Sequence, residues 1–532
     1  MLGRAGRGNS FFLPSADFDR SDSAGQQGVA LRATPFFLFA ILAVGLSDGY
    51  LAGDERTIYG FVSLFNQSET SSLFAFLSEP HDFNLYLQHH FFWFLLQLAQ
   101  TSLLDLSTVM WGIVWGDELR NWLLVYPLAL AACLSIPVAY SALLRLGVDR
   151  SHVLLCTGFF YVGGSVVGLL TGGFIECFML LAVAIRMLLL APAPRARTQA
   201  ILLAVVDFTL VAAKLYSLIF LLAVLPATLA RLRGNSRYRY LVVLSLLCMI
   251  WVLAKSAIPV GAIGELQWAT SSPGLSVAVF LTRLGEATGS FSYGLLWTTP
   301  VLLLLGIPRN ALKPELAQKL LAILALECVS CLYSFWHGAA GMPGQRYIMP
   351  YLLVLLPDMC AGLLALNARF RGTSLVVLVS VAIFLPAIDY RHSLADSYAD
   401  RSGQSMPEVR FGWENLPMLD WSFHPGIFAW RVLIAKWNNE TTMPAARSSG
   451  PALSPTAIAP MTGIARVILA TNSSSPADSR LDHVRQLFAG WVGKLLEFLR
   501  GTFILVLFVT MAGAAYHARR EIDSSVLIHG RP

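Results

Sequence analysis

Long apolar runs constrain the fold of this chain more than any other feature of its sequence. A helix needs about 20 residues to cross the hydrocarbon core of a bilayer. Twelve runs approach or reach that length if the stretch 198–231, which Lys214 and Tyr216 interrupt, is counted as two. They lie near 33–51, 121–146, 152–171, 174–191, 198–213, 216–231, 239–257, 294–307, 318–335, 347–366, 372–388 and 501–516. The sequence therefore predicts an all-α integral membrane protein with about twelve transmembrane helices.

The composition agrees with this class. Of 532 residues, 56% are hydrophobic and 13% are charged, and the mean hydropathy is +0.61. Soluble globular proteins carry about 25% charged residues. The net charge of +6 is spread over many short loops. We therefore interpret Lys and Arg as determinants of topology and predict no nucleic-acid partner.

Basic loops distinguish the two sides of the membrane. With twelve spans, six basic segments fall on the same side as Arg4 and Arg7: 145–150, 194–197, 231–239, 309–319, 368–372 and 517–520. Cytoplasmic loops carry an excess of Lys and Arg. We therefore predict cytoplasmic termini and a long extracytoplasmic first loop, about 52–120.

The chain divides into four predicted regions. Residues 1–32 form a disordered cytoplasmic tail without the apolar segment of a signal peptide, and 33–388 form the membrane core. The first loop contains the amphipathic stretch "DFNLYLQHHFFWFLLQL", which predicts interfacial helices. Residues 389–500 are an extracytoplasmic region with a Ser/Ala/Pro linker and an amphipathic helix. Residues 501–532 hold the last span and a cytoplasmic tail.

Charged residues mark the extracytoplasmic ends of the predicted spans. Asp54 and Glu55 follow the first span, and Glu176 opens another span after a Gly-Gly turn. Asp54 and Glu55 are consistent with the solvated end of a span. Glu176 is consistent with an acid that stabilises the N-terminus of a helix through the helix dipole. Carboxylates at a membrane–water boundary can also take a proton from a hydroxyl group. Because all three lie on one face, we expect Asp54 and Glu176 to converge.

Two cations lie on the same side. Lys214 interrupts an apolar stretch, where it could snorkel, pair with Asp207 or bind a phosphate. Arg346 follows the glycine-rich loop "WHGAAGMPGQRY", which also contains His337. An interfacial anchor and an anion site are both consistent with this segment.

Metal and redox sites have weak sequence signals. The segment 79–90 offers Glu79, His81, Asp82, His89 and His90, which could hold a divalent metal ion, but their spacing matches no strong template. The pair Cys328 and Cys331 is more typical of buried apolar packing. We therefore predict no resident metal and no certain cofactor.

The order of these landmarks resembles a known family. The segments are "GDERTIY", "EPHDFNLYLQHHFFWFLLQL", "FIECFMLLAVAI", "VAAKLYSLIFLLAVLP", "YGLLWTTPVLLLLGIP" and "FWHGAAGMPGQRYIMPYLLVLLP". Together they resemble the GT-C membrane glycosyltransferases, in particular bacterial relatives of the dolichyl-phosphate-mannose protein mannosyltransferases. The resemblance runs from about Asp54 to Pro357. The family's Pro-Pro pair is replaced here by residues around His89 and His90, and the resemblance does not extend over 389–532.

The resemblance implies a fold, a reaction and roles for residues. It implies a sugar donor on a polyprenyl phosphate, an acceptor hydroxyl on a lipid, glycan or protein, and catalysis at the periplasmic face of a bacterial inner membrane. Asp54, or Glu55, would be the base in an inverting displacement. The donor phosphate would bind Lys214, Arg346 and His337. The sugar or the acceptor would bind Glu176, Asp82, His90 and Tyr347.

Two other functions are compatible with the sequence. An O-antigen ligase or polymerase also has about twelve spans and uses Arg and His of a late periplasmic loop, which Arg391 and His392 could supply. A flippase or transporter of lipid-linked glycans is the alternative without catalysis. Transporters place charges on broken helices at the membrane midplane and show internal repeats. This sequence shows charges at span ends and no visible repeat.

The topology gives a direct prediction. A reporter fused after Arg520 should report the cytoplasm, because 517–520 is one of the six basic segments. Paired alkaline phosphatase and fluorescent protein fusions measure this. A fusion within 258–293 is the control and should report the opposite side. A periplasmic signal after Arg520 would contradict twelve spans.

Overall fold

The computed structural model describes residues 25–47, 53–68, 72–79, 84–111, 117–192, 198–232, 234–256, 258–259, 276–290, 294–307, 314–332, 346–370, 372–384, 427, 430 and 505–520. Within these ranges every regular element is a helix, and none is a strand. This agrees with the predicted all-α class.

The first half of the described chain forms α1 (Gly25–Leu46), α2 (Gly53–Gln67), α3 (Leu73–Ser78), α4 (Asn84–His89), α5 (Phe91–Trp111), α6 (Asp117–Arg145), α7 (Arg150–Val162), η2 (Ser165–Thr171), α8 (Glu176–Leu190), α9 (Gln199–Ala213), α10 (Ser217–Arg231) and α11 (Asn235–Lys255). The second half forms α13 (Val277–Gly289), α14 (Leu295–Thr298), η3 (Pro300–Gly306), α15 (Pro314–Leu332), α16 (Met349–Leu352), η4 (Leu353–Leu355), α17 (Leu356–Arg369) and α18 (Thr373–Phe384). Residues 505–520 form a further helix.

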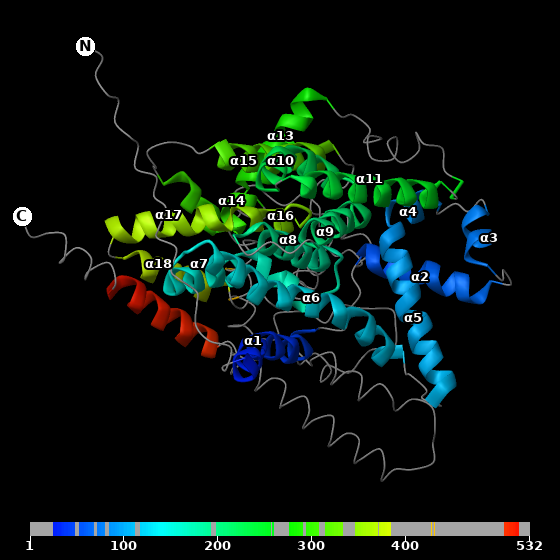
Figure 1. Cartoon of the computed structure of the whole chain (residues 1–532), viewed down its shortest axis with the longest axis horizontal. Helices are drawn as coiled ribbons and strands as arrows, with labels where there is room; N and C mark the ends of the chain where they lie inside the picture. The colour runs from blue at the N-terminus through cyan, green and yellow to red at the C-terminus, as the bar shows by residue number, and fades with distance from the viewer. Residues whose placement is uncertain are drawn as a thin grey trace, which may run out of the picture.

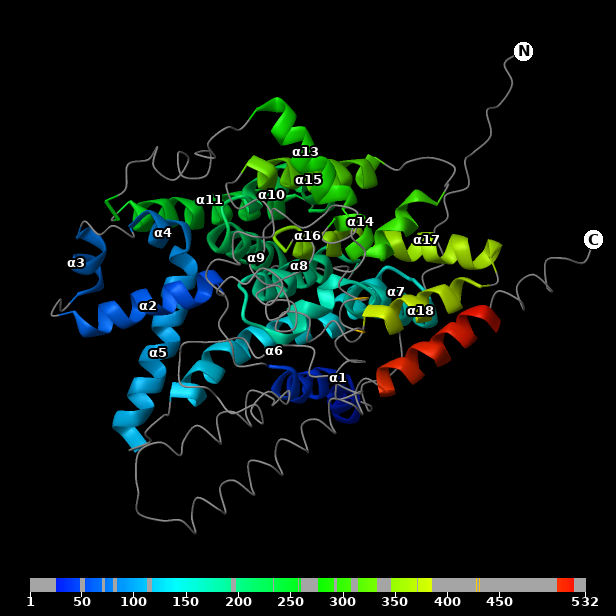
Figure 2. The same cartoon turned by 180° about the vertical axis from the view of Figure 1, so that it is seen from behind.

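Helices α8 and α9 lie at the centre of the bundle. Figures 1 and 2 show α6, α10, α11 and α16 around them, with α2–α5 on one side and α17, α18 and the helix 505–520 on the other. Helix α6 packs along α8, and α11 packs along α9. Residues at the outer ends of α8 and α9 are therefore held by the best-packed part of the protein.

Within the described residues, three helical segments are long and apolar enough to cross a membrane: Trp122–Arg145, Asn235–Lys255 and Met349–Arg369. The pair α7 and η2 would make a fourth, bent by 77°. Shorter apolar helices cover Thr34–Val44, Gln199–Ala213, Ser217–Arg231 and Thr373–Phe384. Each of the twelve apolar runs contains helix, while the count of twelve spans stays a prediction.

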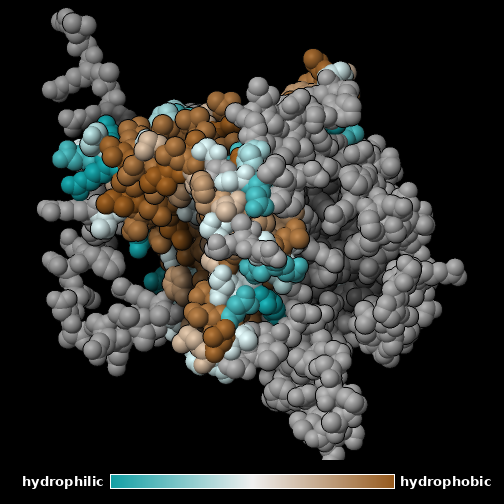
Figure 3. All heavy atoms as spheres, turned by 90° about the vertical axis from the view of Figure 1, so that its right-hand side faces the viewer, coloured by the Kyte–Doolittle hydropathy of each residue, from teal (hydrophilic) through white to brown (hydrophobic). Residues whose placement is uncertain are grey.

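Exposed apolar side chains cover much of the helical surface. Brown apolar surface makes up a large part of the coloured area in Figure 3. Helix α11 contributes exposed Leu246, Met249, Ile250, Val252 and Leu253. Soluble monomers rarely expose contiguous apolar patches of more than a few hundred Å². Such a surface suits contact with lipid.

The run 152–171, predicted as one span, is instead two helices that meet at a sharp bend. The break lies at Gly163 and Gly164, where a Cβ atom on Gly164 would lie 2.8 Å from the Thr298 carbonyl oxygen. The Ser165 hydroxyl donates to that same oxygen at 2.8 Å. The bend between α7 and η2 therefore packs directly on the break between α14 and η3.

A buried polar cluster joins the four helices α8, α9, α10 and α11. Arg186 Nε donates to Asp207 Oδ1 at 2.9 Å, and Tyr240 donates to Asp207 Oδ2 at 2.7 Å. Arg186 also donates to the Thr228 hydroxyl. Asp207 is 0% exposed and Arg186 is 5% exposed. We call these four residues the Arg186 cluster.

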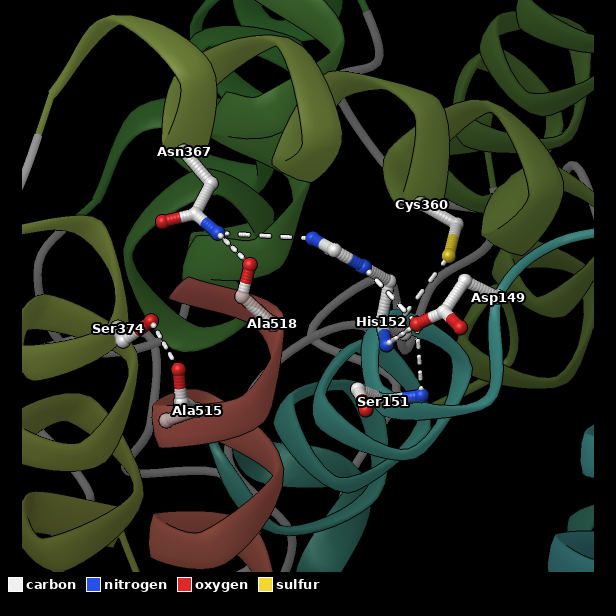
Figure 4. A network of polar contacts seen from close by, with 8 residues as sticks. All are labelled: Asp149, Ser151, His152, Cys360, Asn367, Ser374, Ala515 and Ala518. Atoms are coloured by element: carbon white, nitrogen blue, oxygen red, sulfur yellow. Dashed lines mark hydrogen bonds and ion pairs between the residues drawn. The ribbon is translucent and has the colours of Figure 1, made fainter. Parts of the chain in front are cut away.

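The C-terminal helix is held by a second polar network (Figure 4). Asp149 Oδ2 lies 3.2 Å from His152 Nδ1, and His152 Nε2 lies 3.5 Å from Asn367 Nδ2. Asn367 Nδ2 also donates to the Ala518 carbonyl oxygen at 3.5 Å. This network connects α7, α17 and the helix 505–520 across long sequence separations.

The Arg186 cluster predicts a large loss of stability when one charge is removed. Replacing Arg186 by Met should cost about 3–5 kcal/mol, because Asp207 is left as a buried and uncompensated charge. The double variant Arg186→Met/Asp207→Leu should recover much of this loss. Thermal unfolding in detergent or nanodiscs measures both effects.

The exposed pair Arg231–Glu315, 3.0 Å apart, is the matched control. Exposed ion pairs contribute about 0–1 kcal/mol, so Glu315→Gln should change stability little. If Arg186→Met and Glu315→Gln lowered stability equally, the buried ion pair would matter no more than the exposed one, and the prediction would be wrong.

Candidate functional site

A tight glycine turn places Glu176 at the start of α8. Gly172 and Gly173 have φ angles of 84° and 88°, which glycine adopts most easily. A Cβ atom on Gly172 would lie 2.9 Å from the Ala129 backbone nitrogen, so the turn also packs tightly on α6. Glu176 is the first residue of α8 and is 0% exposed. The predicted Gly-Gly turn followed by a helical N-terminal acid is therefore present.

Arg346 lies against this acid. Its Nε atom is 3.6 Å from Glu176 Oε1, close enough for charge attraction but long for a hydrogen bond. The guanidinium group lies 4.5 Å from the centroid of the Phe174 ring and 5.0 Å from that of the Tyr347 ring. Arg346 Nη2 donates to the Tyr347 hydroxyl at 3.3 Å. Aromatic faces attract a guanidinium group, so the two rings hold this cation in place.

Lys214 is the residue after α9 and not part of it. Its backbone is extended, with φ −150° and ψ 121°. Of the three alternatives for Lys214, pairing with Asp207 is not found, because α9 ends at Ala213 and Asp207 bonds to Arg186 and Tyr240. Lys214 Nζ lies 3.4 Å from His90 Nδ1 and 5.5 Å from the Tyr347 ring centroid.

Both cations, Lys214 and Arg346, lie against the Tyr347 ring. We therefore define the Tyr347 cluster as Glu176, Arg346, Lys214, His90 and Tyr347. Its members come from the start of α8, the end of α9, the junction of α4 and α5, and the turn before α16. Five residues named from the sequence as site candidates thus lie together in the fold.

The other sequence candidates cannot be placed at this cluster. Asp54 and Glu55 lie in α2, but their side chains are outside the described part of the structure. Asp82 and His337 are also outside the described residues, as are Arg391 and His392 of the alternative interpretation. The predicted convergence of Asp54 with Glu176 stays a prediction.

The charges of the Tyr347 cluster do not balance. Lys214 is 2% exposed and Arg346 is 3% exposed, and Glu176 is the one carboxylate that the described residues place in the cluster. No described carboxylate lies within ion-pair distance of Lys214. If the Lys214 ammonium donates to His90 Nδ1, that imidazole is neutral. The described members of the cluster then carry an excess positive charge, which is costly in a buried site unless an anion binds.

Several residues that pack around the Tyr347 cluster were not named from the sequence. Phe174 contacts Arg346, and the Tyr216 ring lies 5.9 Å from that of Tyr347 and 6.2 Å from that of Tyr351. The Tyr351 hydroxyl bonds to that of Ser217. The sequence held a signal for both tyrosines. Tyr216 lies in the same helix break as Lys214, and Tyr351 follows Tyr347 by four residues.

Within the described residues, no group of three His, Cys, Asp or Glu side chains is arranged to hold a metal ion. Of the predicted candidates in 79–90, this covers Glu79, His89 and His90, while His81 and Asp82 are outside the described part.

No protein-family model, curated protein or solved structure matches the chain.

The charge excess predicts opposite stability effects for the two cations. Lys214→Met should leave the unfolding temperature unchanged or raise it, because it removes a buried charge that has no described carboxylate partner. Arg346→Met should lower it, because Glu176 loses its ion-pair partner. Thermal unfolding in detergent measures both. A Lys214→Met loss as large as that of Arg346→Met would show that Lys214 is already neutralised by an acid.

Proposed function

We propose that this protein is a GT-C-type membrane glycosyltransferase with about twelve spans. It transfers a sugar from a polyprenyl-phosphate donor to a hydroxyl group of a lipid, glycan or protein at the extracytoplasmic face. The observation that supports this most is the buried Lys214, which has no carboxylate partner within the described structure and, like Arg346, lies against the Tyr347 ring. A phosphate group is the kind of anion that such a pair of cations binds.

The reaction forms a bond between the acceptor oxygen and the anomeric carbon while the bond from that carbon to the phosphate oxygen breaks. The bonding electrons move to the polyprenyl phosphate, whose added negative charge Lys214 and Arg346 stabilise. The acceptor proton goes to Asp54 or Glu55 as general base. Attack opposite the leaving group inverts the anomeric carbon. The displacement and the proton transfer need no nucleotide.

The remaining members of the Tyr347 cluster support this chemistry. His90, with its Nδ1 3.4 Å from Lys214 Nζ, orients the ammonium group. The Phe174 and Tyr347 rings restrict the Arg346 guanidinium to one position. Fixed cations stabilise a developing charge without reorganisation, which is the main source of rate enhancement in such sites. Glu176 and Tyr347 are then available to contact the sugar or the acceptor.

One observation bears on the transporter alternative. Arg186 and Asp207 are charges in the interior of the bundle, and α7 with η2 is a broken helix. Transporters use such elements along a substrate path. In this protein, however, Arg186 and Asp207 bond to one another and to Thr228 and Tyr240. Their satisfied bonds favour a role in stability over a role in transport.

A donor-consumption assay tests the proposal. The purified protein is incubated with a panel of polyprenyl-phosphate sugars, and release of polyprenyl phosphate is measured. Lys214→Met and Arg346→Met should each lower turnover by about 10²–10³, which is typical for loss of one charge-stabilising donor. Arg391→Met is the control and should keep most of its activity, with folding of each variant confirmed.

The outcomes separate the candidate functions. Loss in Arg391→Met with activity retained in the other two variants would support the ligase interpretation. Equal and mild losses in all three would place the phosphate elsewhere. Asp54→Asn adds a second test, because it should abolish a GT-C reaction and spare a ligase.

A further inference from the structure

Tyr216 presents a buried hydroxyl group that no described residue binds. It is the last residue of the break between α9 and α10, two residues after Lys214. Part of its side chain is exposed, but its hydroxyl oxygen is buried and has no hydrogen-bond partner in the described structure. Buried hydroxyl groups usually have a partner, so an unpaired one calls for an explanation.

The neighbours of this hydroxyl belong to the Tyr347 cluster. The Tyr216 ring packs edge to face with Tyr347 at 5.9 Å and with Tyr351 at 6.2 Å. The Tyr347 hydroxyl accepts a hydrogen bond from Arg346, whose Nε atom lies 3.6 Å from Glu176 Oε1. Two rings therefore hold the Tyr216 side chain against a residue that contacts Arg346, the ion-pair partner of Glu176.

Glu176 also has unused hydrogen-bonding capacity. It is 0% exposed, and neither carboxylate oxygen has a hydrogen-bond partner among the described residues. Its one described charge partner is Arg346 at 3.6 Å, and the Arg346 guanidinium is also engaged by Phe174 and Tyr347. A carboxylate can accept several hydrogen bonds, so acceptor positions remain for a ligand.

Glu176 and Tyr216 together are complementary to a hydroxyl group on a ligand. An ionised carboxylate is an acceptor only, whereas a tyrosine hydroxyl can donate. A ligand hydroxyl group placed between them would donate its proton to Glu176 and accept the proton of Tyr216. An ammonium group could satisfy the acid but not the Tyr216 donor, and a hydrogen or a methyl ether on the ligand would leave the acid unpaired.

We propose that Tyr216 and Glu176 form a subsite that selects a donor sugar by one of its free hydroxyl groups. This assignment rests on the proposed function and identifies Tyr216 as a specificity-determining residue. Discrimination of this kind is strong, because an analogue that lacks the hydroxyl leaves buried protein groups unpaired.

The test compares donors that differ by one hydroxyl group. The probe is the polyprenyl-phosphate sugar that the wild-type protein consumes, together with analogues in which each ring hydroxyl in turn is replaced by hydrogen. The wild-type protein should consume one of these analogues at least 10²-fold more slowly than the parent, as judged by kcat/KM. Tyr216→Phe should reduce that ratio by 10-fold or more, and Glu176→Gln should reduce it at the same ring position.

Tyr351→Phe is the matched control, because the Tyr351 hydroxyl is already bonded to Ser217. It should keep the wild-type ratio. A ratio of two rates from one preparation does not depend on the folded fraction, so partial misfolding of a variant does not obscure the result.

The possible failures are distinguishable. If the wild-type protein consumes no polyprenyl-phosphate sugar, the proposed function fails, and the subsite fails with it. If it consumes a donor but tolerates loss of every ring hydroxyl, or if Tyr216→Phe keeps the wild-type ratio, the subsite alone is overturned. An equal drop of the ratio in Tyr351→Phe would also overturn the assignment to Tyr216.

Discussion

The ion pair between Arg186 and Asp207 is the interaction on which the arrangement of the central helices depends. It lies on α8 and α9, and its hydrogen bonds to Thr228 and Tyr240 include α10 and α11. In an apolar interior, charged groups have no solvent to replace a lost partner, so the helices must keep the register that satisfies all four groups. Glu176 lies about 15 Å along α8 from Arg186 at 1.5 Å per residue, and Lys214 follows directly on α9. The register set by the ion pair thereby determines where the site residues meet.

The two polar groupings differ in how complete they are. In the Arg186 cluster one cation meets one carboxylate, and each also bonds to a hydroxyl group. In the Tyr347 cluster the one described carboxylate pairs with Arg346 alone and makes no hydrogen bond with a described residue, while Lys214 has no described carboxylate partner. A network in which all polar groups are bonded stabilises a fold, while a network with unbonded polar groups can bind a ligand through them. Because of this contrast, we propose the Tyr347 cluster, and not the Arg186 cluster, as the functional site.

The sequence predicted the helical class and the positions of apolar helices because hydropathy and chain breakers are local properties. It also indicated Glu176, Lys214 and Arg346, because isolated charges in apolar segments are costly and therefore conspicuous. It did not identify Arg186 as the partner of Asp207, because the two residues lie 21 positions apart on different helices. It did not anticipate Tyr216 or Phe174, since an aromatic residue in an apolar segment gives no local sign of what its ring will contact. The bend at Gly163 and Gly164 was missed for the same reason, because the close approach of Thr298 is a tertiary contact.

The contact between Asn367 and the Ala518 carbonyl oxygen has a consequence for the order of events during synthesis. The two residues are 151 positions apart, and the C-terminal helix is the last described helix to leave the ribosome. Until it arrives, the Asn367 amide lacks this acceptor, and the end of α17 beside His152 is left without one of its covering helices. The bundle therefore reaches its final packing only after the helix 505–520 has been synthesised, and a chain cut short before residue 518 would expose an incomplete polar network to cellular quality control.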